Sequence, residues 1–181
     1  LVIAITAAAG SGLPVVHVVT RAVEGVGDLV SIDNYAAGRT AALFLSRMQR
    51  LDGTVMALCH PIYQVHRERI RGFSDYLILH PQPGLTFRWL GFGRDEAERS
   101  GDLLLRALDR WPDLVGLYNA GGANATLCKV LRRHPRGRQV FFVGHELTER
   151  SAAALREGVM AVVLDQSPEA QARRAIARML Q

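Results

Sequence analysis

Apolar, β-branched runs alternate with helix-type patterns along almost the whole chain, and this alternation constrains the fold more than any other feature. We expect strands at 14–19, 29–32, 53–59, 85–90, 114–118, 139–143 and 160–164. Helical spacing of apolar residues lies between them, at 34–50, 63–79, 94–109, 123–133, 148–157 and 167–180. A regular strand–helix repeat favours parallel sheets with helices on both faces, so the sequence predicts an α/β fold.

The beginning of the chain gives a mixed signal. The run from Val2 to Thr6 is typical of a strand, whereas the stretch from Ala7 to Gly12 is typical of the end of a helix. We infer that the natural chain continues upstream of Leu1 and that this region is part of an incomplete unit.

Composition narrows the class of protein. The 181 residues are 49% hydrophobic, which is enough for a sizeable core. No run approaches the roughly eighteen apolar residues of a membrane span, so we expect no membrane partner. The net charge is +5, but the arginines are scattered and are not interleaved with aromatic residues, so direct nucleic-acid binding is not indicated.

The two cysteines, Cys59 and Cys128, have no metal-ligand spacing, and we expect buried thiols in a reducing compartment. A disulfide between them stays open as the alternative. The histidines at 60, 66 and 80 also lack zinc spacing, so we expect no metal. Gly121-Gly122 is not followed by the Lys-Ser/Thr pair of a phosphate loop, and we expect no cofactor.

Polar groups follow five of the expected strands. They are Asp33-Asn34, the segment 60–71, Asn119, His145-Glu146 and Asp165-Gln166. The carboxyl ends of parallel strands share one edge of a sheet, which is where open α/β folds bind ligands. Carboxylates, carboxamides and arginine suit a polyol, and an aromatic residue such as Trp89 is suited to form an apolar wall.

Each of these residues also has a purely structural explanation. Asp33 is a natural N-cap for the helix that follows, and Asn119 could bond its own loop backbone. Arg69 could belong to a surface ion-pair cluster, and Trp89 could be a core residue. His145 and Glu146 could cap the next helix, and Asp165 is a natural helix entry. Their recurrence at one sheet edge is what favours a binding site.

An enzyme is the weaker interpretation. Glu146 beside His145 could suggest acid–base chemistry, but no serine sits in a nucleophile elbow and neither cysteine has a neighbouring base in sequence. We therefore expect a binding protein rather than an enzyme.

Five segments in a fixed order resemble the effector-binding domain of the LacI/GalR family of bacterial transcription regulators. They are 30–38, 69–73, 116–122, 143–148 and 165–166. That domain shares its fold with type I periplasmic sugar-binding proteins. The resemblance implies two Rossmann-like subdomains with parallel sheets flanked by helices, both truncated here. Residues 1–51 and 167–181 would form the amino-terminal subdomain and 52–166 the carboxyl-terminal one.

The resemblance also implies ligand contacts, residue by residue. Asp33 matches an acidic ligand contact ahead of the helix glycine, and Arg69 matches the arginine of an Arg-x-x-Gly pattern. Asn119 matches a polar residue that ends a ligand-facing strand. Glu146 stands where members usually have aspartate, which lengthens its reach by one methylene. Gln166 matches a crossover residue, and Trp89 approximates an aromatic wall.

The leading hypothesis is therefore the ligand-sensing domain of a LacI-type regulator. A sugar or related polar effector would bind between the subdomains of a cytoplasmic homodimer and control DNA binding. Operator DNA would be contacted only through an amino-terminal helix-turn-helix that this chain lacks. The alternative is the periplasmic sugar-binding protein of an ABC importer, which has the same fold.

Overall fold

Two compact units make up the chain in the computed structural model, which describes residues 1–180 with the side chain of Trp89 excepted. The smaller unit combines Leu1–Asp33 with Gln166–Gln181, and the larger one is the continuous segment Asn34–Asp165. Each unit has its own sheet. The strand–helix alternation expected from the sequence is confirmed, with parallel pairing throughout the described strands.

The smaller unit contains α1 (Val2–Gly10), β1 (Val16–Val18), β2 (Asp28–Val30) and α7 (Pro168–Met179). Strand β1 pairs with β2 in parallel, and α7 packs on both. The buried residues here are His17, Val30, Gln171 and Ala175. The expectation of a strand over Val2–Thr6 was wrong, because α1 begins at Val2. Alanines at 4 and 7–9 favour a helix and outweigh the β-branched residues among them.

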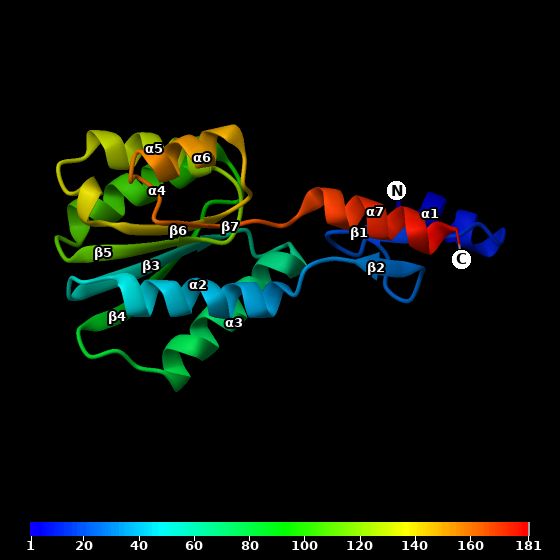
Figure 1. Ribbon diagram of the computed structural model, residues 1–181, viewed down its shortest axis with the longest axis horizontal. Coiled ribbons are helices and arrows are strands. Elements are labelled where there is room, and N and C mark those ends of the chain that lie inside the picture. The colour runs from blue at the N-terminus through cyan, green and yellow to red at the C-terminus, as the bar shows by residue number, and fades with distance from the viewer. Residues whose placement is uncertain (181) are drawn as a thin grey trace. The chain divides into compact units, whose positions relative to one another are not determined.

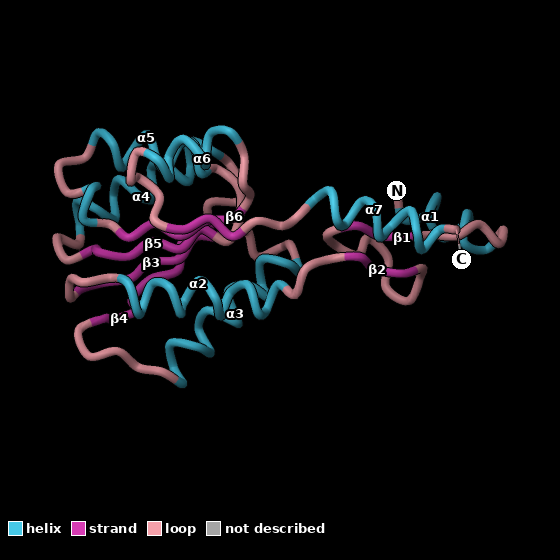
Figure 2. The backbone as a smooth tube through the Cα atoms, in the orientation of Figure 1, coloured by secondary structure: helices cyan, strands magenta, loops and turns pink. Residues whose placement is uncertain are grey.

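The larger unit is a five-stranded parallel sheet in the order β4-β3-β5-β6-β7 (Figure 2). Its strands are β3 (Gly53–Cys59), β4 (Leu85–Phe92), β5 (Leu114–Asn119), β6 (Phe141–His145) and β7 (Val162–Leu164). Its helices are α2 (Asn34–Met48), α3 (Gln64–Leu79), α4 (Ala97–Arg110), α5 (Asn124–Arg133) and α6 (Glu149–Arg156), with a short 3₁₀ turn at Gly137–Gln139.

Helices cover both faces of this sheet, with α2 and α3 on one side and α4, α5 and α6 on the other (Figure 1). Alternate residues of β3 face opposite layers, as the pleat of a strand requires. Met56 and Leu58 join the cluster beneath α4–α6, whereas Val55 and Ala57 join the cluster beneath α2 and α3. Because both faces are buried, the central strands are continuously apolar.

The division between the units differs from the boundary expected near residue 51. Helix α2 belongs to the larger unit, because its residues Ala41, Ala42 and Leu45 are fully buried in the cluster beneath α2 and α3. The apolar face of α2 is therefore part of the core that also contains Phe73 of α3. The second boundary, between Asp165 and Gln166, lies one residue before the expected one.

Candidate functional site

The carboxyl edge of the five-stranded sheet gathers most of the polar groups that the sequence singled out. Strand β3 ends at Cys59 and is followed by α3, and β4 is followed by the loop 93–96. Strand β5 ends at Asn119, just before the Gly121-Gly122 loop, and β6 ends at His145. Strands β3 and β5 are neighbours in the sheet, as are β5 and β6. The expected ligand groups of this unit, Arg69, Asn119 and Glu146, are therefore brought to one edge.

Arg69 on α3 is almost completely buried, with 2% of its surface exposed. Its Nε donates to Asn34 Oδ1 at 2.8 Å and its Nη1 donates to the carbonyl of Ala120 at 2.8 Å. Burial lowers the pKa of Arg69, and the nearby Tyr118, Glu146 and Asp95 raise it in part. The guanidinium thus joins the start of α2 to the loop after β5, which is a different role from a surface ion-pair cluster.

Close packing of α2 on α3 determines where Arg69 lies. A Cβ on Gly38 would clash with the carbonyl of Arg69, and a Cβ on Gly72 would clash with the carbonyl of Tyr35. Glycine at both positions lets the two helix backbones approach closely. Gly38 and Gly72 therefore both allow the close approach of α2 and α3. This approach lets Arg69 on α3 bond Asn34 at the start of α2.

Asn119 holds the loop that follows β5. Its Nδ2 donates to the carbonyls of Gly121 and Gly122 and lies 2.8 Å from Asn124 Oδ1. Asn124 in turn donates from Nδ2 to the carbonyl of His145 at 2.7 Å, which ties this loop to the end of β6. Asn119 is 3% exposed. Its described contacts match the structural alternative considered for it, in which it satisfies loop backbone.

A neutral pair lies beneath these loops. Tyr118 Oη and His145 Nε2 are 2.9 Å apart, and both side chains are fully buried. The ring of Tyr118 stacks on Phe73 with centroids 4.6 Å apart. Burial lowers the pKa of His145 to about 2 and raises the pKa of Tyr118. Both groups are therefore uncharged at neutral pH and act as hydrogen-bonding partners within the core.

Aromatic and acidic side chains surround the end of β3. The rings of His60, Tyr63 and His66 are in edge contact, and His66 Nδ1 accepts from the backbone N–H of His60 at 3.1 Å. Asp95 Oδ1 accepts from the N–H of Gly122 at 2.9 Å. Burial raises the pKa of Cys59 to about 11, so this residue is a thiol rather than a nucleophilic thiolate at neutral pH.

Glu146 is exposed, and its backbone is tightly fixed. Its φ of 70° is in the left-handed region, its N–H donates to the carbonyl of Leu164 at 3.0 Å, and its carbonyl accepts from Ser151 Oγ at 2.7 Å. Ser151 and Thr148 form a capping box that begins α6. The backbone of Glu146 is therefore held in place while its carboxylate reaches solvent.

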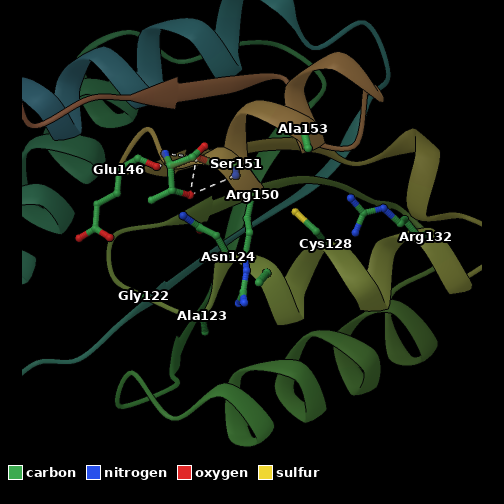
Figure 3. Close-up of a pocket in the computed structure, with 11 residues that line it drawn as sticks. Gly122, Ala123, Asn124, Cys128, Arg132, Glu146, Arg150, Ser151 and Ala153 are labelled. Atoms are coloured by element: carbon green, nitrogen blue, oxygen red, sulfur yellow. Dashed lines mark hydrogen bonds between the residues drawn. The ribbon is translucent and has the colours of Figure 1, made fainter.

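A pocket of about 280 Å³ lies beside Glu146, between α5 and α6 (Figure 3). Glu146 lies at one end of it, Cys128 lies along α5, and Arg150 extends from α6 towards α5. Arg132, at the other end, pairs with Glu157 at 2.6 Å. Burial raises the pKa of Cys128 to about 11. Cys59 and Cys128 are both free thiols, so the alternative of a disulfide between them is excluded.

The remaining expected site residues lie elsewhere. Asp33 and Gln166 belong to the smaller unit, at its two junctions with the larger one. Asp33 is exposed, and the carbonyl of Gln166 accepts from Gln171 Nε2 at 2.6 Å. The backbone of Trp89 lies within β4 opposite Met56, three residues before the strand ends at Phe92, and its side chain falls outside the described residues.

The sequence did not predict a ligand contact or a structural role for five further residues at this edge, which are Asn34, His66, Asp95, Tyr118 and His145. Asn34 and His145 were noticed only as neighbours of Asp33 and Glu146. Asp95 gave no signal, because the α4 helix was expected to begin at Arg94, whereas it begins at Ala97. Tyr118 was taken as an ordinary strand residue, and its partner across the sheet could not be known from its own segment.

No cluster of three or more His, Cys, Asp or Glu side chains with metal-binding geometry occurs in residues 1–180. Within the same range, no helix combines the length and the apolar character needed to cross a membrane. The sheet edge carries the exposed carboxylates of Asp95 and Glu146, the buried guanidinium of Arg69, and other polar groups that hydrogen bonds hold in place. Such groups suit the recognition of a polar molecule.

Several solved structures with this architecture are sugar-binding or solute-binding proteins of bacteria. The sugar-binding protein of a sugar ABC transporter from Bacillus halodurans aligns with a TM-score of 0.88 and 20% identity, over 97% of this chain and 61% of that one. A periplasmic solute-binding protein from Actinobacillus succinogenes, solved with D-allose, aligns with a TM-score of 0.86 and 20% identity, over 98% and 66%.

A solute-binding protein from Burkholderia graminis, in complex with D-arabinose, aligns with a TM-score of 0.86 and 18% identity, over 97% and 62%. The chain thus spans less than two thirds of the length of these proteins. No curated protein matches it. The family described as "Periplasmic binding protein domain" matches residues 1–181. The fold class expected from the sequence is confirmed, and the chain belongs to the periplasmic binding protein domain family.

Proposed function

We propose that the chain binds a sugar or a related small polyol, with the carboxyl edge of the five-stranded sheet as the larger unit's share of the site. One observation carries this proposal. Arg69 Nη1 donates to the carbonyl of Ala120 and Asp95 Oδ1 accepts from the N–H of Gly122, so the loop after β5 holds a buried guanidinium and an exposed carboxylate at one edge, and the exposed Glu146 follows β6 at the same edge. Asn119 holds the loop between them.

The chemistry of these groups matches that of a sugar. Carboxylates accept hydrogen bonds from hydroxyl groups, and a guanidinium donates along fixed directions. Burial of Arg69 strengthens its interactions, because the local dielectric is low. The proposed contacts in the larger unit are Arg69, Asn119 and Glu146, whereas Asp33, Gln166 and Trp89 stay predictions from the sequence. Proteins of the same fold bound to D-allose and D-arabinose support this ligand class.

Two biological settings are consistent with such a domain. The similar solved structures are mostly sugar-binding components of ABC transporters, which favours a solute receptor. The ordered segments 30–38, 69–73, 116–122 and 143–148 favour the second candidate, the effector domain of a cytoplasmic, dimeric LacI-type regulator. The amino-terminal sequence of the full-length protein separates them: a secretory signal supports the receptor, and a helix-turn-helix supports the regulator.

Isothermal titration calorimetry with D-allose, D-arabinose, D-glucose and D-galactose tests the ligand class. At least one aldose should bind saturably and raise the melting temperature, because a ligand of the folded state stabilises it. Glu146→Gln should weaken that binding at least tenfold, since a neutral amide accepts hydroxyl protons less strongly than a carboxylate. Glu149→Gln, at an exposed position in the first turn of α6, is the matched control and should bind like the unaltered chain. Failure of all four aldoses to bind at millimolar concentration would contradict the proposal.

A further inference from the structure

Exposed arginines gather at the amino edge of the five-stranded sheet, which is the edge where its strands begin. Because the strands are all parallel, the loops that precede β3, β5, β6 and β7 lie at one end of the larger unit (Figure 1). The arginines lie in these loops or in the last helical turn before them, and they are Arg47, Arg50, Arg133, Arg138 and Arg156. These amino-edge arginines are scattered in the sequence, and the fold brings them together.

Hydrogen bonds hold the loops of this edge together. Gln49 Nε2 donates to the carbonyls of Val115 and Gln139, which ties the end of α2 to the start of β5 and to the turn before β6. Arg136 Nη1 donates to the carbonyl of Trp111 at 3.2 Å, which joins the loop before β6 to the end of α4. The amino-edge arginines therefore lie on one fixed surface rather than on independent loops.

The positive charge of this surface is not neutralised by its own carboxylates. Asp113 accepts from Thr54 Oγ1 at 2.8 Å, and Glu157 pairs with Arg132 at 2.6 Å. The carboxylates that remain exposed there are Asp52 and Asp109. Among residues 1–180, none of the five amino-edge guanidinium groups has a hydrogen bond or an ion pair. The amino edge thus presents unpaired positive charge to solvent.

Two exposed apolar side chains lie among the amino-edge arginines. Met48 and Leu51 are 52% and 45% exposed, and each directly follows an arginine at the end of α2. Guanidinium groups suit phosphate, which they bind through paired N–H donors. Aliphatic side chains suit an apolar layer, whereas surfaces for single-stranded nucleic acid use aromatic rings that stack on bases. An anionic bilayer offers both partners, with phosphates at its surface and acyl chains directly beneath them.

We propose that the amino edge of the larger unit is a peripheral contact surface for an anionic lipid bilayer. The amino-edge arginines bind headgroup phosphates, and Met48 and Leu51 enter the boundary between headgroups and acyl chains. This contact departs from the expectation of no membrane partner, which rested on the lack of a membrane span and not on exposed side chains. It uses the edge opposite the proposed sugar site, so it stands or falls independently of that function.

Vesicle sedimentation tests this surface, with vesicles of phosphatidylcholine alone and of phosphatidylcholine with about one third phosphatidylglycerol. The unaltered chain should sediment with the anionic vesicles at low salt, and about 0.5 M salt should release it, because salt screens exposed charges. The double variant Arg47→Gln/Arg50→Gln should bind at least tenfold more weakly, since each arginine at an anionic surface strengthens binding about fivefold. Met48→Ala/Leu51→Ala should also weaken binding, by at least threefold, through the loss of buried apolar surface.

Arg94→Gln/Arg150→Gln is the matched control, because it removes the same charge from two exposed arginines at the carboxyl edge. It should bind the anionic vesicles as the unaltered chain does. The proposal is wrong if the unaltered chain does not sediment with anionic vesicles, or if the control loses as much binding as Arg47→Gln/Arg50→Gln. Binding of a short DNA duplex without binding of vesicles would also overturn it and would assign the amino edge to nucleic acid.

Discussion

His145 is a single imidazole with consequences for the stability of the whole larger unit. Its side chain is fully buried, and its Nδ1 has no hydrogen-bond partner among the described residues. Its neutral ring forms a hydrogen bond with Tyr118. Protonation would place a positive charge in the core, where burial disfavours it and the charge of Arg69 repels it. The folded state therefore resists protonation of this residue.

The pH dependence of stability follows from that resistance. Burial holds the pKa of His145 at about 2, against an ordinary value of 6.5. Below pH 6.5 the unfolded chain takes up the proton and the folded chain does not, so stability is complete above pH 6.5 and is lost as the pH falls. The loss approaches about 1.4 kcal/mol per pH unit. Urea unfolding of His145→Gln should show a shallower fall between pH 6.5 and 4.5 than the unaltered chain.

His66 contributes in the same direction, since burial lowers its pKa too, so a residual slope is expected in His145→Gln. His80→Gln, at the exposed C-cap of α3, serves as the control and should keep the full slope. An unchanged slope in His145→Gln would show that His145 is protonated in the folded chain.

Arg69 shows how far a sequence can specify one residue. Its place in the Arg-x-x-Gly pattern predicted a ligand contact, which stays a prediction, and the residue does lie at the expected sheet edge. Its bonds to Asn34 and Ala120 come from segments distant in sequence, and they show that the residue also holds the architecture together. Truncation of Arg69 would leave two buried acceptors without a donor, so it would disturb folding as well as any ligand contact.

At the scale of elements, the contact between α2 and α3 depends on the absence of two side chains. Gly38 and Gly72 lie where the helix backbones meet, and any Cβ there would overlap a carbonyl oxygen of the other helix. Helical periodicity predicted both helices to within a few residues, because an amphipathic pattern is local. The pairing of the two helices was not predictable, because it depends on complementary surfaces rather than on either pattern.

Gly72→Ala should destabilise the larger unit by about 1–3 kcal/mol, because the added methyl group must push the two helices apart. Equilibrium unfolding in urea measures this difference. Ile78→Ala is the matched control on the same helix, since Ile78 is 74% exposed, and it should change stability by less than about 0.5 kcal/mol. Equal stability of Gly72→Ala and the unaltered chain would mean that the helices tolerate a wider separation.

At the scale of the molecule, the apolar core is unequally divided. Both large clusters of buried apolar residues lie within Asn34–Asp165. The smaller unit buries Val30 and Ala175, and α1 contains no buried residue. Since buried apolar area is the main favourable contribution to folding, the larger unit should be much the more stable of the two.

Native-state hydrogen exchange tests this inequality. The amides of β1, β2 and α7 should exchange orders of magnitude faster than those of β3 and β5, because local opening of the smaller unit exposes little apolar surface. The amides of α2 are the internal control, and they should be protected together with β3, as expected for a helix of the larger unit. Equal protection of β1 and β3 would contradict the division of the core.

The amino-acid sequence was sufficient to predict the class of fold and the order of most elements. Alternating periodicities are local, and parallel strands in an α/β fold present their carboxyl ends at one edge, so polar residues after strands could be assigned to that edge. Local patterns compete where the expectations differed from the structure, at α1, at the end of β4 and at the start of α4.

The folded structure was needed to show which groups meet. It paired Tyr118 with His145, Arg69 with Asn34, and Asp95 with Gly122, across separations in sequence that no periodic pattern spans. It also showed that Asn119 bonds its own loop, through the carbonyls of Gly121 and Gly122. These facts depend on packing, because a buried side chain finds its partner through the shape and burial of the whole core rather than through its own segment.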